Sequence, residues 1–396
     1  MVSPSAIDVS VLIPVHNKAA YLDECLDSIL SQTGANFEVI CVDDGSTDGS
    51  SEILARRVEV EPRLRVLNQS CAGPSAARNV ALDHARGAYV LFVDADDALE
   101  PGMLERVVSS ARKCDAQVVL FGWSEWYPET GASIPHYAGA GLHEGDIFSL
   151  RSIEPLSLFV FTPSSCVKLF SRAWVESQGA RFHEDIRASE DLAFTYEVFA
   201  DVERMTVIPD LLYRYRQRVA HSLITKVPAH DCLTALDYIA ASNDGAYLSD
   251  PLLRRHFANL VLDTAHYALD AAQDSDSLTK LYQIVQRRWM PFLREHESDI
   301  DAFFLPMYRK LCQEGAFEYA VTRVGELRRD VTDAFERASV AEGKVRGLEE
   351  RCRELEERIG NLMRDQRMVR GSYAFKVGRV LTWLPSRVRA ALKGGR

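Results

Sequence analysis

Three carboxylates follow directly after an apolar run of β-forming residues in segment 89–97, which reads YVLFVDADD. A buried strand of this composition exposes only its end, where Asp94, Asp96 and Asp97 stand together. Like charges held close together repel one another, and such clusters commonly bind a divalent cation such as Mg²⁺ or Mn²⁺. An acidic turn that caps the next helix is the alternative interpretation.

Alternating strands and helices are predicted for the part of the chain that contains this cluster. Apolar runs rich in β formers recur at residues 9–15, 37–43, 65–68 and 89–94. Amphipathic helical patterns separate the first two runs (residues 20–32) and the last two (residues 76–85). This alternation favours an α/β fold with a mostly parallel sheet flanked by helices. In such sheets ligands bind beyond the carboxyl ends of the strands, so the segments that follow the strands are expected to carry the chemistry.

The segments after the first two strands and before the fourth hold residues suited to a nucleotide. Pro14 and Val15 offer backbone groups to a base, and Asn17 follows them. The carboxylate of Asp44 can accept a hydrogen bond from a uracil-type N–H. Arg78 stands near the start of a helix, where its guanidinium and the helix N-terminus could both face a diphosphate. A surface arginine on a helix is the alternative.

The segments IPVHN, VDDGSTDGS, AGPSAARN and FVDADD resemble, in this order and spacing, the family 2 nucleotide-sugar glycosyltransferases with the GT-A fold. The resemblance covers roughly the first 220 residues. It implies that Asp94, Ala95 and Asp96 form a D-x-D motif whose first and third positions contact the ribose and the metal. Asp97 is then a supporting residue or a helix cap.

The same resemblance extends to the segment SEDLAF at residues 189–194, which is similar to the family's E-D-x-x-F segment. It implies that Asp191 is the catalytic base and that Glu190 lies at the donor. In a single displacement, one carboxylate takes the proton of the acceptor hydroxyl while the nucleoside diphosphate leaves from the other side, so the anomeric carbon is inverted. The alternative is that both carboxylates only cap the following helix.

Further residues enter through the resemblance alone. Lys168 resembles a lysine that the family places before an apolar pair, and Arg214 and Arg216 lie where the family often has phosphate or metal contacts. His221, in the same segment, is a candidate third metal ligand beside Asp94 and Asp96; a lone histidine is otherwise more often a surface or core residue. The segment from about residue 123 to 165 reads as aromatic and Gly-rich loops, whose Trp123, Trp126 and Tyr127 could stack on a sugar or pack in the core.

Composition sets limits on the class of protein. The 396 residues are enough for two or three structural units. The net charge of −11 argues against general nucleic-acid binding. The eight cysteines are scattered without metal-ligand spacing, and the sequence shows neither a signal peptide nor an apolar run long enough to span a bilayer. A cytoplasmic protein is therefore expected, with attachment to the inner face of the plasma membrane as a further expectation.

Beyond residue 224 the organisation changes. Helical patterns predict an α-helical extension at 225–322, after the GT-A domain at 1–224. Apolar residues in steps of three and four predict a parallel two-stranded coiled coil at 323–370, and hence a homodimer; a helix folded against its own chain is the alternative. A basic amphipathic tail at 371–396 completes the chain. Residues 364–396 hold nine basic side chains against one acidic, which suits an anionic membrane surface or the acidic body of the chain's own dimer.

Together these features predict a metal-dependent inverting glycosyltransferase that uses Mn²⁺ or Mg²⁺. It would move a sugar from a nucleotide-sugar donor, expected to be a UDP-sugar, to a hydroxyl of a glycan or lipid-linked acceptor in surface polysaccharide biosynthesis. Two alternatives remain open. A sugar nucleotidyltransferase should show a Gly-rich, basic triphosphate loop near its N-terminus, which IPVHN is not. A catalytically silent, dimeric, membrane-associated scaffold would not need the carboxylates at 94, 96 and 191.

Overall fold

The computed structural model describes residues 6–138, 141–154, 164–187, 189–217, 230–272, 274–316 and 318–319. The chain divides into two units: Met1–Asp270 with Val285–Cys312, and Ala271–Ile284 with Gln313–Arg396. The expected coiled coil, the expected basic tail and His221 all lie outside the described residues. The predictions made for them therefore stay predictions.

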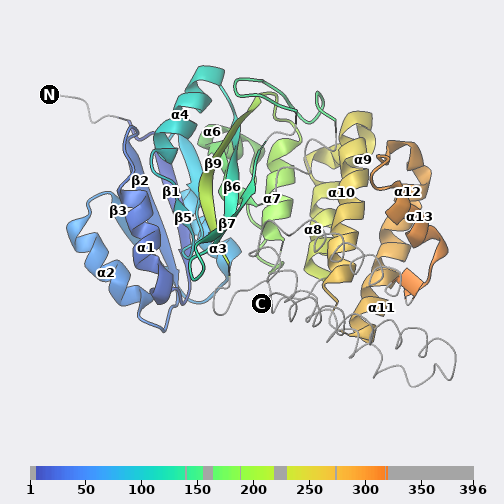
Figure 1. The fold of residues 1–396 in the computed structure, drawn as a ribbon, viewed down its shortest axis with the longest axis horizontal. Helices are drawn as coiled ribbons and strands as arrows, with labels where there is room; N and C mark the ends of the chain where they lie inside the picture. Colours follow the sequence, from blue (N-terminus) through green and yellow to red (C-terminus); the bar gives the residue numbers. More distant parts are fainter. Residues whose placement is uncertain are drawn as a thin grey trace, which may run out of the picture. The chain divides into compact units, whose positions relative to one another are not determined.

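Four parallel strands form one half of a nine-stranded sheet, in the order β3-β2-β1-β4 (Figure 1). They are β1 (Val9–Val15), β2 (Phe37–Asp44), β3 (Leu64–Gln69) and β4 (Tyr89–Phe92). β2 is buried along its whole length instead of at every second residue, because the sheet is covered on both faces. These are the strands that the apolar runs predict, with bounds that differ by at most two residues.

The other half of the sheet is mixed and completes the order β4-β8-β6-β9-β5, with β7 paired to β6. β8 runs antiparallel to β4 and β6, whereas β6 and β9 are parallel. The elements are β5 (Ala98–Leu99), β6 (Val118–Tyr127), β7 (Ala132–His136), β8 (Lys168–Ser171) and β9 (Met205–Arg216).

The expectation of loops from residue 123 onward was wrong for its first part. Trp123, Trp126 and Tyr127 lie in β6, and a hairpin leads from there to β7. Tryptophan and tyrosine fit the pleated surface of a strand well, and this propensity outweighs the Gly-rich composition that follows.

Helices of the sheet region connect the strands and pack against them. α1 packs an apolar stripe against the sheet, in which Leu22, Cys25, Leu26 and Ile29 are buried. α3 begins with a proline directly after Gly73, whose φ of 97° favours glycine. The helices are α1 (Ala19–Leu30), α2 (Ser50–Val60), α3 (Pro74–Asp83), α4 (Met103–Cys114), α6 (Arg172–Gln178) and α7 (Glu190–Phe199), with a short 3₁₀ turn at Ser165–Val167.

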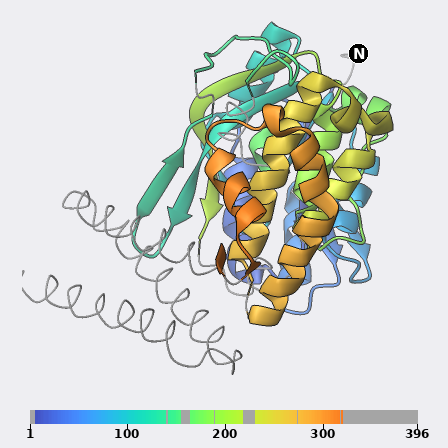
Figure 2. The ribbon, with the colours of Figure 1, turned by 90° about the vertical axis from the view of Figure 1, so that its right-hand side faces the viewer.

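The helical pattern predicted beyond residue 224 is present in the described residues. In the first unit, α8 packs against α7, and α10 packs against α8 and α9 (Figure 2). The buried Tyr247 hydroxyl donates to the carbonyl of Tyr196 at 2.6 Å and so ties α9 to α7. These helices are α8 (His230–Ala241), α9 (Ala246–Ser249), α10 (Pro251–Asp270), α12 (Met290–Glu295) and α13 (Leu305–Gln313), with a π-helical turn at Val285–Trp289 and 3₁₀ turns at Asn243–Gly245 and Glu297–Asp299. α11 (Ser275–Ile284) belongs to the second unit.

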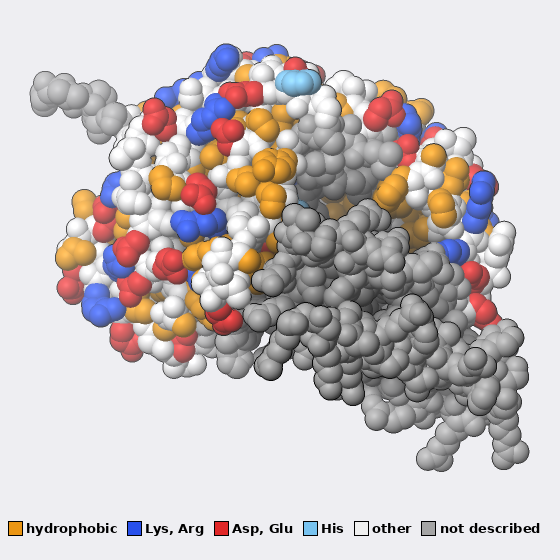
Figure 3. All heavy atoms as spheres, in the orientation of Figure 1, with side chains coloured by type: hydrophobic (Ala, Val, Ile, Leu, Met, Phe, Trp, Pro, Cys, Tyr) orange, Lys and Arg blue, Asp and Glu red, His pale blue; other side chains and the backbone are white. Residues whose placement is uncertain are grey.

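The register of the central strands determines where the polar segments meet. Val15 lies opposite Asp43, and Leu12 lies opposite Phe92. The residues that follow β1, β2 and β4 therefore share one edge of the sheet. On the face drawn in Figure 3, charged side chains of both signs are interspersed with apolar ones over the described residues, as on an ordinary domain surface.

Candidate active site

Asp97 supports the acidic turn after β4 from inside the protein. Its Oδ2 accepts a hydrogen bond from the Tyr213 hydroxyl at 2.6 Å, and its Oδ1 accepts one from the Arg216 backbone N–H at 2.8 Å. Burial, together with the neighbouring charges of Asp96 and Asp94, raises the pKa of Asp97 well above its usual range. Because both oxygens are bonded to β9, Asp97 is a supporting residue of the turn and not a helix cap.

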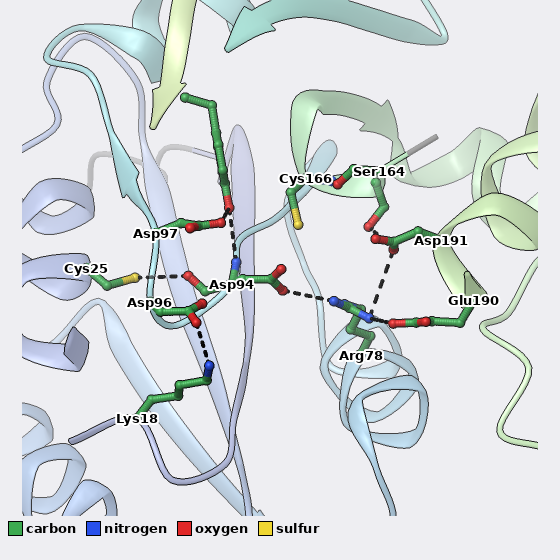
Figure 4. A network of polar contacts seen from close by, with 12 residues as sticks. Lys18, Cys25, Arg78, Asp94, Asp96, Asp97, Ser164, Cys166, Glu190 and Asp191 are labelled. Atoms are coloured by element: carbon green, nitrogen blue, oxygen red, sulfur yellow. Dashed lines mark hydrogen bonds and ion pairs between the residues drawn. The ribbon is translucent and has the colours of Figure 1, made fainter. Parts of the chain in front are cut away.

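Asp94 and Asp96 point toward two cations of the chain itself (Figure 4). Asp94 Oδ1 accepts from Arg78 Nη2 at 2.9 Å, and Asp96 Oδ2 accepts from Lys18 Nζ at 2.5 Å. Burial raises the pKa of Asp96, and Lys18 opposes this shift. Arg78 and Lys18 each bond only one oxygen of their carboxylate. Carboxylate oxygens are the ligands that Mg²⁺ and Mn²⁺ prefer, so this pair fits a divalent cation.

Arg78 lies between Asp94, at the end of β4, and the acidic pair Glu190 and Asp191, at the start of α7. Its Nη1 donates to Glu190 Oε1 at 2.7 Å and lies 4.0 Å from Asp191 Oδ1, while its Nη2 is bonded to Asp94 (Figure 4). The residue is only 4% exposed. Burial alone would lower the pKa of Arg78, but Asp191, Asp94 and Glu190 together raise it well above its usual range. The guanidinium thus lies between carboxylates, and the diphosphate contact expected of Arg78 stays a prediction.

Asp191 lies in the first turn of α7, next to the 3₁₀ turn that precedes β8. The Ser165 hydroxyl donates to Asp191 Oδ1 at 2.6 Å. Ser189 is the N-cap of α7, but its side chain makes no capping hydrogen bond to the helix. The Asp191 side chain is directed toward Ser165. Burial raises the pKa of Glu190, against the opposing charge of Arg78. Ser165 could not be predicted as a site residue, because a serine 26 residues from Asp191 gives no local signal.

Lys168 is fully buried beneath this turn. Its Nζ donates to the Ser164 carbonyl at 2.5 Å. Burial lowers the pKa of Lys168 to about 7, although the charge of Asp191 raises it. The lysine therefore helps to hold the turn that carries Ser165.

Asp44, at the end of β2, sits in a ring of donors on the expected nucleobase side. Its Oδ1 accepts from Gln69 Nε2 and from the Ala72 N–H, both at 2.7 Å, and its Oδ2 accepts from the Gly73 N–H at 2.8 Å. A carboxylate oxygen can accept two hydrogen bonds, so Oδ2 retains capacity for one more donor.

The remaining residues of this side shape the loops around Asp44. Asn17, with a positive φ of 53°, accepts from the Thr47 N–H at 2.7 Å and so orders the loop after β1. Pro14 and Val15 pair with β2, opposite Val42 and Asp43. Ala95, within the acidic turn, is only 2% exposed.

The two tryptophans of β6 already have partners in the chain. The Trp123 ring stacks on His136 with centroids 3.9 Å apart. The guanidinium groups of Arg216 and Arg214 lie over the Trp126 ring, with their Cζ atoms 4.2 Å and 4.9 Å from its centroid. Arg216 in turn donates through Nε to the Asp96 carbonyl at 2.6 Å. Both rings therefore pack against other side chains of the chain while staying half-buried.

Known proteins share this arrangement of segments. Residues 10–177 match the model of glycosyl transferase family 2. Glycosyltransferase GlyG of Streptococcus pneumoniae serotype 4 (strain ATCC BAA-334 / TIGR4) is 30% identical over 270 residues, which cover 64% of this chain and 87% of GlyG. The chain belongs to glycosyltransferase family 2. The family that the four motifs predict is confirmed.

Other members are similar to this family 2 chain over different lengths. The uncharacterized glycosyltransferase EpsJ of Bacillus subtilis (strain 168) is 30% identical over 222 residues, which cover 56% of this chain but only 63% of EpsJ. The solved structure of S. aureus TarS 1–349 in complex with UDP-GlcNAc has 21% identity and a TM-score of 0.62, covering 79% of this chain and 89% of that one. This likeness confirms the GT-A fold. Among the described residues of the family 2 chain, no helix is both long and apolar enough to cross a membrane.

Proposed function

We propose that the protein is a metal-dependent inverting glycosyltransferase that transfers a sugar from a UDP-sugar to a hydroxyl of a glycan or lipid-linked acceptor. The observation that carries this proposal is the position of Arg78. It bonds Asp94, in the D-x-D motif, and Glu190, next to the candidate base, through one buried guanidinium. The same guanidinium lies 4.0 Å from Asp191 Oδ1, so the donor-side carboxylate of Asp94 and the candidate base belong to one network, as a single displacement requires.

Asp44 supports a uridine nucleotide. Its Oδ2 can accept one more hydrogen bond, as from the N–H of a uracil ring, whereas its other contacts hold the carboxylate in place. TarS, which shares the fold, is solved with UDP-GlcNAc and is named a poly(ribitol-phosphate) beta-N-acetylglucosaminyltransferase. We extend to this chain the class of donor, a UDP-sugar. The proposed acceptor remains a hydroxyl of a surface glycan or of a lipid-linked glycan.

Asp191 is assigned the role of base. Ser165 occupies its Oδ1, so Oδ2 is the oxygen that would accept the proton of the acceptor hydroxyl. Glu190 and Arg78 orient the first turn of α7 beside it. Asp94 and Asp96 would hold the divalent cation, which supplies positive charge to the departing diphosphate. Deprotonation from the acceptor side and departure on the donor side give inversion at the anomeric carbon.

A thermal-shift screen of nucleoside diphosphates, with and without Mn²⁺, tests this function. UDP with Mn²⁺ is expected to raise Tm by about 3 °C or more at saturating concentration, because ligand binding stabilises the native state. GDP and ADP serve as matched controls that lack the uracil ring. If no nucleoside diphosphate raises Tm and no donor is hydrolysed, the silent scaffold becomes the better description.

Asp44→Ala is expected to raise the Kd for UDP by about thirtyfold, because removal of the carboxylate leaves the base and three chain donors without their acceptor. Isothermal titration with UDP measures this change. The affinity for inorganic pyrophosphate is the control and should stay at the wild-type value. An equal loss for both ligands would contradict a nucleobase role for Asp44.

A further inference from the structure

The three carboxylates of the acidic turn after β4 all have partners within the chain. Asp97 is satisfied by hydrogen bonds from β9, Asp94 by Arg78, and Asp96 by Lys18. A divalent cation that approaches Asp94 and Asp96 therefore meets carboxylates that already have partners. One of these partners has to give way or share its carboxylate.

The two resident cations are held with different strength. The Arg78 side chain is 5% exposed and bridges two carboxylates, so its displacement would leave Glu190 without its cation. The Lys18 side chain is 22% exposed, and its Nζ bonds Asp96. A lysine ammonium on a flexible stem can also rotate to a new anion, whereas a buried guanidinium fork cannot. Lys18 is thus the cation that can leave.

The backbone of Lys18 is fixed even though its side chain can move. Its N–H donates to Ser50 Oγ at 2.9 Å, and it follows Asn17, which is itself bonded to Thr47. It directly precedes α1, so the loops after β1 and β2 together aim the side chain across the acidic turn (Figure 4). An ammonium anchored there stays near the site after it releases Asp96.

We propose that Lys18 is an exchangeable counter-ion of Asp96, which gives up this carboxylate when a divalent cation binds and takes the diphosphate of the donor as its new partner. This inference rests on the proposed metal-dependent function. Its consequence is a coupling between ligands: the cation binds weakly alone, because it competes with Lys18 for Asp96, and more tightly with UDP, which provides the lysine with another anion. By linkage, each ligand strengthens the other by the same factor.

Titration of the full chain with Mn²⁺, followed by the EPR signal of free Mn²⁺, tests this with and without UDP. In the absence of UDP, Lys18→Gln is expected to bind Mn²⁺ about tenfold more tightly than the wild type. The factor by which UDP increases the Mn²⁺ affinity should be about tenfold smaller in this variant than in the wild type. Lys113→Gln, on the exposed side of α4, removes the same charge away from the site and should behave as the wild type. Circular dichroism verifies that the variants are folded.

The other outcomes separate the two proposals. Tightening of Mn²⁺ binding by the same factor with and without UDP would indicate a general loss of positive charge and would overturn the exchange. Unchanged or weaker binding of Mn²⁺ alone by Lys18→Gln would overturn it as well. If no protein binds Mn²⁺ even with UDP, the metal-dependent function itself fails, and the role of Lys18 fails with it.

Discussion

Asp191→Asn is expected to lower kcat for sugar transfer about 1,000-fold, because an amide cannot take the proton of the acceptor hydroxyl. Asparagine keeps the size of the side chain, and its carbonyl oxygen can still accept the hydrogen bond from Ser165. The fold and the affinity for UDP should therefore remain those of the wild type. A radiolabelled UDP-sugar assay and isothermal titration measure the two quantities.

Ser165→Ala is the matched control for this variant. It leaves the carboxylate of Asp191 in place but removes the hydrogen bond that orients it, and a bond to a charged group is worth about 1.5 kcal/mol, or about a tenfold loss of kcat. A wild-type rate in Asp191→Asn, or a larger loss in Ser165→Ala than in Asp191→Asn, would mean that another group is the base.

Arg78→Met is expected to lower the free energy of unfolding by about 3 kcal/mol, because it removes the cation from a buried network and leaves its carboxylates without compensation. Methionine fills the same volume without charge. Urea denaturation followed by circular dichroism measures the loss. Stability within about 0.5 kcal/mol of the wild type would contradict the bridging role assigned to Arg78.

The loss in Arg78→Met should depend on pH in a defined direction. Burial raises the pKa of Glu190, and the charge of Arg78 partly opposes this shift. Loss of the Arg78 charge is therefore expected to raise the pKa of Glu190 further. A carboxyl whose pKa is higher in the folded state binds more protons there, so folding loses stability as the pH rises through that window. The deficit should be smaller at about pH 5 than at about pH 8. Glu190→Gln in the Arg78→Met background removes the uncompensated charge and should recover part of the stability.

Local sequence predicted the parallel half of the fold with little error. The runs that became β1, β2 and β4 consist mostly of apolar β formers, and a strand with both faces buried leaves that signature whatever its neighbours are. The mixed half was harder to predict. β8 has only four residues and β5 only two, so their identity depends on partners that are distant in sequence.

The sequence alone determined the family and the chemical inventory of the site: an apolar strand that ends in Asp94 and Asp96, a carboxylate at Asp44, and the acidic pair at Glu190 and Asp191. These features are local, because they depend on residue types at short spacing. Only the tertiary structure decided which charges meet. Arg78 lies 112 residues from Glu190, and Lys18 lies 78 residues from Asp96. Coulomb attraction between buried groups depends on distance in space, and that distance exists only once the strands and helices have packed.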